Sequence, residues 1–281
     1  MNQDISDETI PGVVINSHSL PPDIDVTIPS PARIYDYYLG GMTNYPADRA
    51  AAERALAVVP HGRQIARANR KFLVRAVKYL ARNGVQQFID LGTGIPTSPN
   101  VHEAARAIAP GARVVYIDND PVVTLHNRAL LPPGDAWIAA IYGDIRNPRN
   151  ITTHPVVREV IDFSRPVGVL FVAVLHFVAD SGDPYRSVAV FRDRIPPGSY
   201  LAISHITSDG TAPKVIRAIE DAYNQASAPA VFRSREEIRS FFAGFDLVRP
   251  GLVEVSDWRG NNRAPENLPA LRFLGGVGRK R

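Results

Sequence analysis

The chain has 281 residues, of which 45% are hydrophobic and 21% charged, a composition that excludes a wholly disordered protein. It contains no cysteine, which excludes disulfides, thiolate metal sites, iron–sulfur clusters and cysteine nucleophiles, and is consistent with a reducing compartment. The formal net charge of +4 is too small to indicate nucleic-acid binding by itself.

No segment has the pattern of a membrane span or a secretory signal. The most apolar stretch, 167–179, has 13 residues and contains His176, whereas a membrane helix needs roughly 20 apolar residues. The first ten residues are acidic and polar, without a basic start before an apolar core. We therefore expect a cytoplasmic protein with no membrane contact.

The N-terminal part divides into an arm and a helical extension. Residues 1–30 are rich in Pro, Ser and Asp and have no sustained period, which predicts a mobile or extended arm. Residues 31–84 have helical character, interrupted at LGGMTNYP by two glycines and a proline. Helices are expected over 47–58 and 63–82, the second ending at Asn83–Gly84.

From residue 85 onward, apolar strands alternate with helices. The expected strands are 85–91, 113–117, 136–142, 167–175 and 199–206, followed by a late antiparallel pair at 245–255 and 271–277. The expected helices are 99–108, 121–131, 154–161, 184–194, 213–225 and 235–243. Unbroken apolar strands separated by helices predict an α/β domain over 85–281, with a mostly parallel sheet covered by helices on both faces. Ligands on such sheets bind outside the carboxyl ends of the strands.

The loop after the first strand, FIDLGTGIPT, indicates a nucleotide-type cofactor. Gly92 and Gly94 permit a tight turn and a close approach of the backbone to a ligand. A carboxylate at Asp90 would repel the pyrophosphate of a dinucleotide but suits a ligand with an ammonium group. The third glycine of the dinucleotide fingerprint is missing, because Thr97 stands in its place. Both features favour S-adenosylmethionine over NAD.

The next two expected strands are each followed by an acidic residue at the same edge of the sheet. Asp118 lies 24 residues beyond Gly94, where a carboxylate can accept hydrogen bonds from ribose hydroxyls. Asn119 would lie near the adenine, and Asp120 is explained as the cap of the helix that follows. The third strand ends in Gly-Asp-Ile, where Asp144 can accept from the adenine amino group and Ile145 can cover the ring.

The ordered set FIDLGTGIPT, VYIDNDP and YGDI resembles the class I S-adenosylmethionine-dependent methyltransferases. The segments SPARIYDYYLGGMTNYPADR, RANRKFLVRAVKYLARNGVQQFIDLGTG and GGVGRK more closely resemble the actinobacterial S-adenosyl methyltransferase family once known as DUF574. This resemblance covers about 29–280 and implies a seven-stranded Rossmann-like sheet with an N-terminal helical extension. It implies S-adenosylmethionine as cofactor and S-adenosylhomocysteine as product, and it brings no established acceptor.

The resemblance implies cofactor binding at Asp90, Gly92, Gly94, Asp118 and Asp144. We also assign to the cofactor site Thr93, Thr97, Asn119, Gly143, Ile145, Ala173, Tyr37, Gly41 and Arg70. One departure is Pro96, where many class I members have glycine; it stiffens the turn without removing the amides of Gly94 and Thr97.

His176, after the fourth strand, is the candidate catalytic residue. A histidine there can act as a general base, as a hydrogen-bonding group beside the cofactor, or as a core residue paired with backbone. The sequence leaves these alternatives open. The motifs Asn-Pro-Pro-Tyr and Asp-Pro-Pro-Tyr are absent, which argues against the usual base or amide N-methylation.

Two features of the extension have competing interpretations. Four of the ten tyrosines fall within the 11 residues 35–45, either as a lid that closes over the cofactor or as a helix packed on the sheet. Seven Arg or Lys residues follow from Arg63 to Arg82 without an acidic residue, and a solvated helix face is favoured over a site for an anionic acceptor or nucleic acid. Either Arg67 or Arg70 could instead reach the cofactor carboxylate.

The predicted function is methyl transfer to an acceptor expected to be a small molecule. The alternatives are a cofactor-binding protein without turnover, an NAD-dependent oxidoreductase and a basic nucleic-acid binder. No metal is expected, because the seven histidines show no paired ligand spacing. The oligomeric state is left open.

Overall fold

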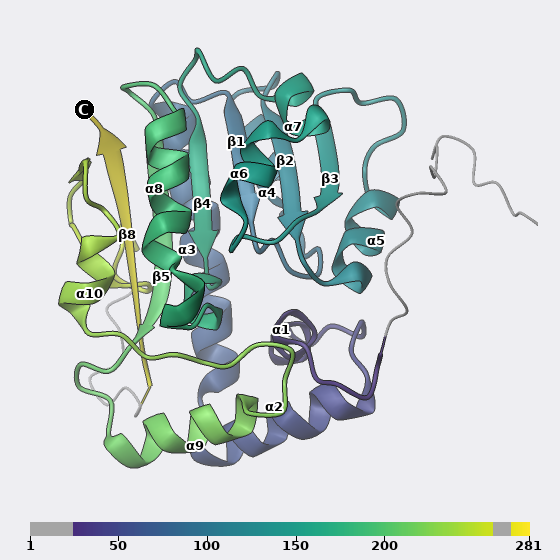
Figure 1. The fold of residues 1–281 in the computed structure, drawn as a ribbon, viewed down its shortest axis with the longest axis vertical. Coiled ribbons are helices and arrows are strands. Elements are labelled where there is room, and N and C mark those ends of the chain that lie inside the picture. The colour runs from purple at the N-terminus through teal and green to yellow at the C-terminus, as the bar shows by residue number, and fades with distance from the viewer. Residues whose placement is uncertain (1–24, 261–270) are drawn as a thin grey trace, which may run out of the picture.

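The computed structural model describes residues 25–260 and 271–281 (Figure 1). Of the predicted arm 1–30, residues 1–24 lie outside the described residues. The described part forms a sheet covered by helices on both faces, with a further helical layer beneath the carboxyl ends of the parallel strands.

The sheet has the strand order β3-β2-β1-β4-β5-β8-β6, with β7 also paired to β8. The strands are β1 (Gln87–Leu91), β2 (Arg113–Asp118), β3 (Ile138–Tyr142), β4 (Gly168–Val172), β5 (Tyr200–Thr207), β6 (Phe245–Leu247), β7 (Val253–Glu254) and β8 (Arg272–Lys280). The first five are parallel, whereas β8 runs antiparallel to β5, β6 and β7. Strand order reverses between β1 and β4, and ligands of open α/β sheets bind at such a switch point.

Helices cover both faces of the sheet, and a further layer of helices lies beneath the carboxyl ends of the parallel strands. They are α1 (Pro31–Leu39), α2 (Pro46–Val58), α3 (Gly62–Arg82), α4 (Val101–Arg106), α5 (Pro121–Ala129), α6 (Pro148–Thr153), α7 (Pro155–Val160), α8 (Pro184–Arg194), α9 (Pro213–Tyr223) and α10 (Arg235–Ser240), with short 3-10 turns η1 (Leu175–Phe177) and η2 (Asp180–Gly182). Most α-helices begin with proline at the first position, where the missing N–H costs nothing.

Two apolar cores lie on opposite faces of the sheet because successive strand side chains point in opposite directions. Phe88 and Val114 pack with α3 and α4 in one core, and Ile89 and Val115 pack with α6, α7, α8 and α10 in the other. Every residue of β1 is buried, as a strand covered on both faces requires. The cores therefore hold the strand ends rigid where a ligand would bind.

The N-terminal extension lies under the carboxyl ends of the parallel strands. Helices α1 and α2 contact each other, α2 contacts α9, and α3 runs up one face of the sheet (Figure 1). Asp48 accepts hydrogen bonds from the N–H groups of Ser30 and Tyr45, both 2.8 Å long. It thereby links the residue before α1 to the residue before α2. The extension predicted for 31–84 is thus packed against the rest of the fold.

The sequence predicts the α/β architecture correctly, but some bounds differ. In the described part of the chain the sheet has eight strands instead of seven, because the expected strand 245–255 is split by a turn at Pro250–Gly251, with φ of +94° at Gly251. The fourth strand stops at Val172, where Ala173 adopts a φ of +59° and turns the chain into η1. Helix α6 is an additional element, which the sequence pattern does not predict.

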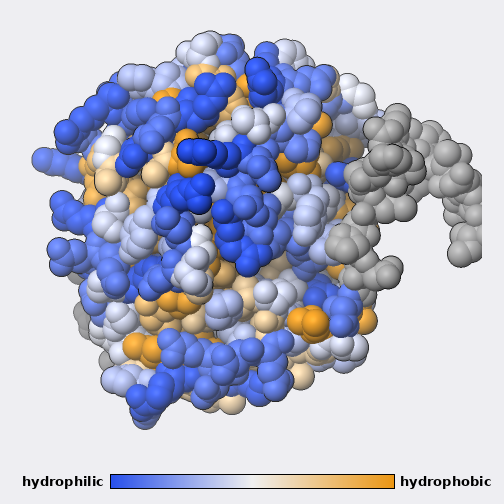
Figure 2. All heavy atoms as spheres, viewed as in Figure 1, coloured by the Kyte–Doolittle hydropathy of each residue, from blue (hydrophilic) through white to orange (hydrophobic). Residues whose placement is uncertain are grey.

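The surface seen from the side of Figure 1 is mostly hydrophilic, with scattered apolar patches above the α9 and α2 layer (Figure 2). Within residues 25–260 and 271–281, no helix combines the length and apolar character needed to cross a membrane.

Candidate functional site

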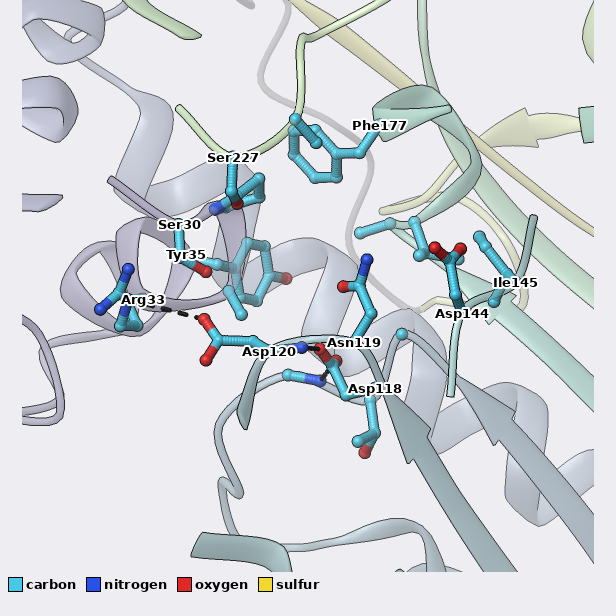
Figure 3. A pocket seen from close by; sticks show the side chains of 18 of the residues that line it. Ser30, Arg33, Tyr35, Asp118, Asn119, Asp120, Asp144, Ile145, Phe177 and Ser227 are labelled. Atoms are coloured by element: carbon cyan, nitrogen blue, oxygen red, sulfur yellow. Dashed lines mark hydrogen bonds and ion pairs between the residues drawn. The ribbon is translucent and has the colours of Figure 1, made fainter. Parts of the chain in front are cut away.

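A cavity of about 380 Å³ opens at the carboxyl ends of β1, β2, β3 and β4, with α1 and α3 forming the opposite wall (Figure 3). Its volume falls in the range of small-molecule sites. Eleven of the predicted cofactor residues line it: Arg70, Asp90, Gly92, Thr93, Gly94, Asp118, Asn119, Gly143, Asp144, Ile145 and Ala173. Residues from four separate strand ends thus meet in one place.

The glycine loop after β1 is built for close backbone contact. Gly92 and Gly94 both have φ of +67°, a conformation that residues with a Cβ rarely adopt. A Cβ on Gly92 would lie 2.2 Å from Cγ2 of Val174, so only glycine fits there. A Cβ on Gly94 would meet no atom within 4 Å, so this backbone is open to a ligand.

Asp90 is a buried carboxyl, with 4% of the residue exposed. Its Oδ2 accepts a hydrogen bond of 2.9 Å from the Thr93 hydroxyl. Burial raises the pKa of Asp90 to about 6, although Thr93 and the charge of Arg70 act in the opposite direction. A cationic ligand group beside Asp90 would favour its ionised form.

Asp118 holds two loops together. Its Oδ2 accepts from the N–H of Gly94 at 2.9 Å, and its Oδ1 accepts from the N–H of Asp120 at 2.9 Å. Burial raises the pKa of Asp118 to about 7 despite these two hydrogen bonds. Each carboxylate oxygen still has a second lone pair, which a ribose hydroxyl could use.

Asp144 is already paired with Arg146, whose role no sequence pattern indicates. The side chain of Arg146 donates from Nε to both Asp144 oxygens at 2.9 Å. Although burial acts to raise the pKa of Asp144, its hydrogen bonds with Arg146 hold the pKa below its ordinary value. Ile145 is 7% exposed and lies beside Asp144 at the cavity wall (Figure 3).

Arg70 joins α3 to the loop before α4. It donates to the carbonyl oxygens of Thr97 and Pro99, the second at 2.7 Å. Its Nε is buried and has no hydrogen-bond partner among the described residues, and the side chain lines the cavity. Arg70 and Asp90 therefore present one positive and one negative group to the same cavity, the first from α3 and the second from the end of β1. That pairing fits the zwitterionic amino-acid end of S-adenosylmethionine.

Arg33 ties the extension to the cavity and is not predicted from the sequence. Its Nε lies 3.5 Å from Asp48 Oδ1 and 3.5 Å from Asp120 Oδ2, and the residue is 4% exposed. Asp120 caps α5 by accepting from Val122 N–H at 2.8 Å, as expected. Figure 3 shows the Arg33–Asp120 pair at the edge of the cavity. No sequence pattern indicates that this arginine, rather than its neighbours, faces the site.

The tyrosine-rich segment does not act as one surface. Tyr35 lines the cavity, and its hydroxyl donates to Ala66 O at 2.8 Å. Tyr37 does not line the cavity, because its hydroxyl donates to Glu53 at 2.5 Å and its ring lies under Arg63. Gly41 is also outside the cavity wall, where the Asp36 carboxylate packs against it.

Two further predicted residues lie outside the cavity wall. The N–H of Thr97 donates to Asn100 Oδ1 at 3.1 Å, so this amide does not face a ligand. His176 is 4% exposed and sits in η1, because the chain turns at Ala173 before reaching it. Burial, His205 and Arg233 hold the pKa of His176 well below its ordinary value.

The basic residues of α3 mostly hold the fold together or face solvent. Arg63 donates to Tyr37 O at 2.9 Å, and Arg75 donates from Nε to Trp258 O at 2.8 Å. Arg67 is exposed and does not line the cavity, so Arg70 alone of the two predicted arginines faces it. Among the described residues, no group of three His, Asp or Glu side chains has the arrangement of a metal site.

Comparisons with known proteins bear on this cavity. A family model described as S-adenosyl methyltransferase matches residues 17–281. A crystal structure described as a putative methyltransferase from Thermobifida fusca is 40% identical, with a TM-score of 0.86, covering 92% of this chain and 98% of that one. A DUF574 family protein from Streptomyces avermitilis is 38% identical, with a TM-score of 0.86, covering 92% of this chain and 99% of that one.

No curated protein matches the chain. The family model spans nearly its whole length, and both solved structures share its fold. The chain belongs to the S-adenosyl methyltransferase family and is an S-adenosylmethionine-dependent methyltransferase.

Proposed function

We propose that the protein holds S-adenosylmethionine in the cavity at the carboxyl ends of β1 to β4 and transfers its methyl group to a small-molecule acceptor. The observation that supports this most is the convergence of Asp90, Asp118 and Asp144 from three successive strand ends on one cavity of about 380 Å³. A macromolecular acceptor has less support, because the basic face of α3 is partly used in internal contacts.

Each carboxylate has a distinct proposed role. Asp90, together with Arg70, binds the amino-acid end of the cofactor. Asp118 accepts from the ribose hydroxyls, and Asp144 accepts from the adenine amino group while Ile145 covers the ring. Gly94 and Asn119 line the same cavity and complete the proposed nucleoside site.

When bound, the cofactor would supply a methyl group on a positively charged sulfur. A lone pair of the acceptor would form the new bond, the electron pair of the carbon–sulfur bond would stay on sulfur, and the acceptor's proton would be released to solvent. The protein then mainly has to align the acceptor and exclude water. The α1 wall, with Tyr35 and Arg33, closes the cavity opposite the strand ends. We propose this wall as the lid of the site.

Formation of product distinguishes methyl transfer from cofactor binding without catalysis. Incubation with S-adenosylmethionine and a panel of small alcohols and phenols should give S-adenosylhomocysteine at a rate that depends on acceptor concentration. S-adenosylhomocysteine should also raise the melting temperature, whereas NAD should not. A shift with NAD alone would overturn the assignment of the site.

A further inference from the structure

A second, smaller cavity adjoins the proposed cofactor site. It has a volume of about 70 Å³ and lies between α1, α2, α3 and α9 and the ends of β4 and β5. We call it the inner chamber. Tyr35, Ala173 and Phe177 line both the inner chamber and the cofactor cavity, so these three side chains form the partition between them.

The walls of the inner chamber are almost entirely apolar. Ala55, Val59 and Ile219 are each at most 5% exposed, and among the described residues no acidic, lysine or arginine side chain lines the chamber. Much of the wall comes from α1, α2 and α3, which lie outside the predicted methyltransferase domain 85–281. The extension thus supplies a shape that the α/β domain alone would lack.

Two polar side chains of the inner chamber differ in their hydrogen bonding: the hydroxyl of Tyr35 is paired, whereas one nitrogen of His176 is not. The Tyr35 hydroxyl donates to Ala66 O and accepts from Asn69 Nδ2 at 3.0 Å. The imidazole of His176 lines the chamber, and its Nδ1 is buried without a partner in the described part of the chain. A buried polar atom left unpaired costs about 1–3 kcal/mol, so a ligand hydroxyl that hydrogen-bonds this imidazole would offset that cost.

We propose that the inner chamber binds the acceptor: an uncharged molecule with a compact apolar group and a hydroxyl that hydrogen-bonds the imidazole of His176. This rests on the proposed function, because the partition places the chamber beside the cofactor cavity. The acceptor's apolar group lies in the chamber and its hydroxyl lies at His176, whose ring centroid is 4.3 Å from that of the partition residue Phe177.

The chemical class follows from the lining. An alkylammonium or carboxylate group would be desolvated with no opposite charge in the wall, which is costly, so charged acceptors are disfavoured. The chamber's 70 Å³ is about half of the roughly 150 Å³ cavity that holds benzene, which limits the buried group to a short branched chain. His176 stays neutral because its pKa is lowered, and a neutral imidazole can accept a hydrogen bond.

The test measures probe binding in the presence of saturating S-adenosylhomocysteine. The probes are 2-methyl-1-propanol and 1-chloro-2-methylpropane, which have similar size but differ in the hydroxyl, and saturation-transfer NMR reports their affinities. Ala55→Leu fills the chamber from α2, whereas Ala50→Leu adds the same side chain at an exposed position of that helix. His176→Phe removes the hydrogen-bonding nitrogens and keeps a ring.

Both probes should bind the wild-type protein and Ala50→Leu, and both should lose binding in Ala55→Leu. In His176→Phe the affinity of the alcohol relative to the chloride should fall about 2- to 13-fold, the value of one hydrogen bond. His176→Gln should restore part of that preference. Unaltered probe binding in Ala55→Leu, no probe binding to wild type, or an unchanged preference in His176→Phe would overturn the proposal.

Calorimetry with S-adenosylhomocysteine separates this proposal from the proposed function. The Ala55 and His176 variants should bind it as wild type does, which also shows that they fold. If all proteins bind S-adenosylhomocysteine but the probes behave alike in all variants, only the acceptor site is wrong. If wild type does not bind it, the cofactor assignment itself fails.

Discussion

The carboxylate of Asp118 accepts a hydrogen bond of 2.9 Å from the N–H of Gly94, a residue in the loop of the neighbouring strand. The end of β2 therefore fixes the glycine loop of β1 before any ligand binds. The residue proposed to bind the ribose thus also orients the backbone of the glycine loop beside it.

The two buried carboxyls predict a pH-dependent cofactor affinity. Their pKa values are raised from an ordinary value near 3.8 to about 6 for Asp90 and about 7 for Asp118. A ligand that donates to the ionised forms releases protons on binding, so affinity should rise as pH increases from 5 toward 8. The rise should be up to about tenfold per pH unit for each carboxyl that must ionise.

The same raised pKa values determine whether folding stability rises or falls with pH. Because the folded-state pKa values are raised, these carboxyls favour folding below about pH 4, and that contribution is lost as pH rises through 6 and 7. S-adenosylhomocysteine should offset the loss, giving a larger melting-temperature shift at pH 7.5 than at pH 5.5. Calorimetry in buffers of different ionisation enthalpy checks proton release; proton uptake would contradict the assignment.

The glycine loop offers a matched pair of substitutions. Gly92→Ala and Gly94→Ala both place a Cβ at φ +67°, but only the first collides with Val174. Gly92→Ala should therefore lose more stability to chemical denaturation than Gly94→Ala, whose backbone cost is about 1–2 kcal/mol. Shortening Val174 to Ala should rescue part of the Gly92→Ala loss. Equal losses in the two single variants would show that the collision is relieved without cost.

The contact between Arg33 and Asp120 predicts a link between the extension and the cofactor site. Arg33→Met keeps the apolar stem but leaves the fully buried Asp48 without its guanidinium, so unfolding by urea should be easier by about 1–3 kcal/mol. Affinity for S-adenosylhomocysteine should also fall, because α1 carries part of the cavity wall.

Arg54→Met, at an exposed position of α2, is the control for this variant and should change neither quantity. If Arg33→Met binds S-adenosylhomocysteine with wild-type affinity, α1 does not contribute to the cofactor site.

The sequence predicts the sheet and the strand-end residues well because both depend on local patterns. Apolar runs such as 167–175 predict buried strands, and Gly92, Asp118 and Asp144 lie directly after such strands. The register then brings the carboxyl ends together without further information.

The sequence predicts less where tertiary contacts decide. The turn at Ala173 moves His176 away from the cofactor cavity, and nothing in the apolar run 167–179 indicates where the strand stops. Tyr35 and Tyr37 are two residues apart on one helix, yet one lines the cavity and the other contacts Glu53. The roles of Arg33 and Arg146 depend on partners that only the fold brings near.

The most direct test of the account is calorimetric binding of S-adenosylhomocysteine to Asp90→Asn and Asp118→Asn, with Asp162→Asn as an exposed control outside the cavity wall. Hydrogen bonds to charged groups contribute about 1.5–3 kcal/mol, so each cavity variant should bind about 10- to 150-fold more weakly. The Asp162 variant should bind as wild type does. Wild-type affinity in either cavity variant would contradict the claim that these carboxylates hold the cofactor.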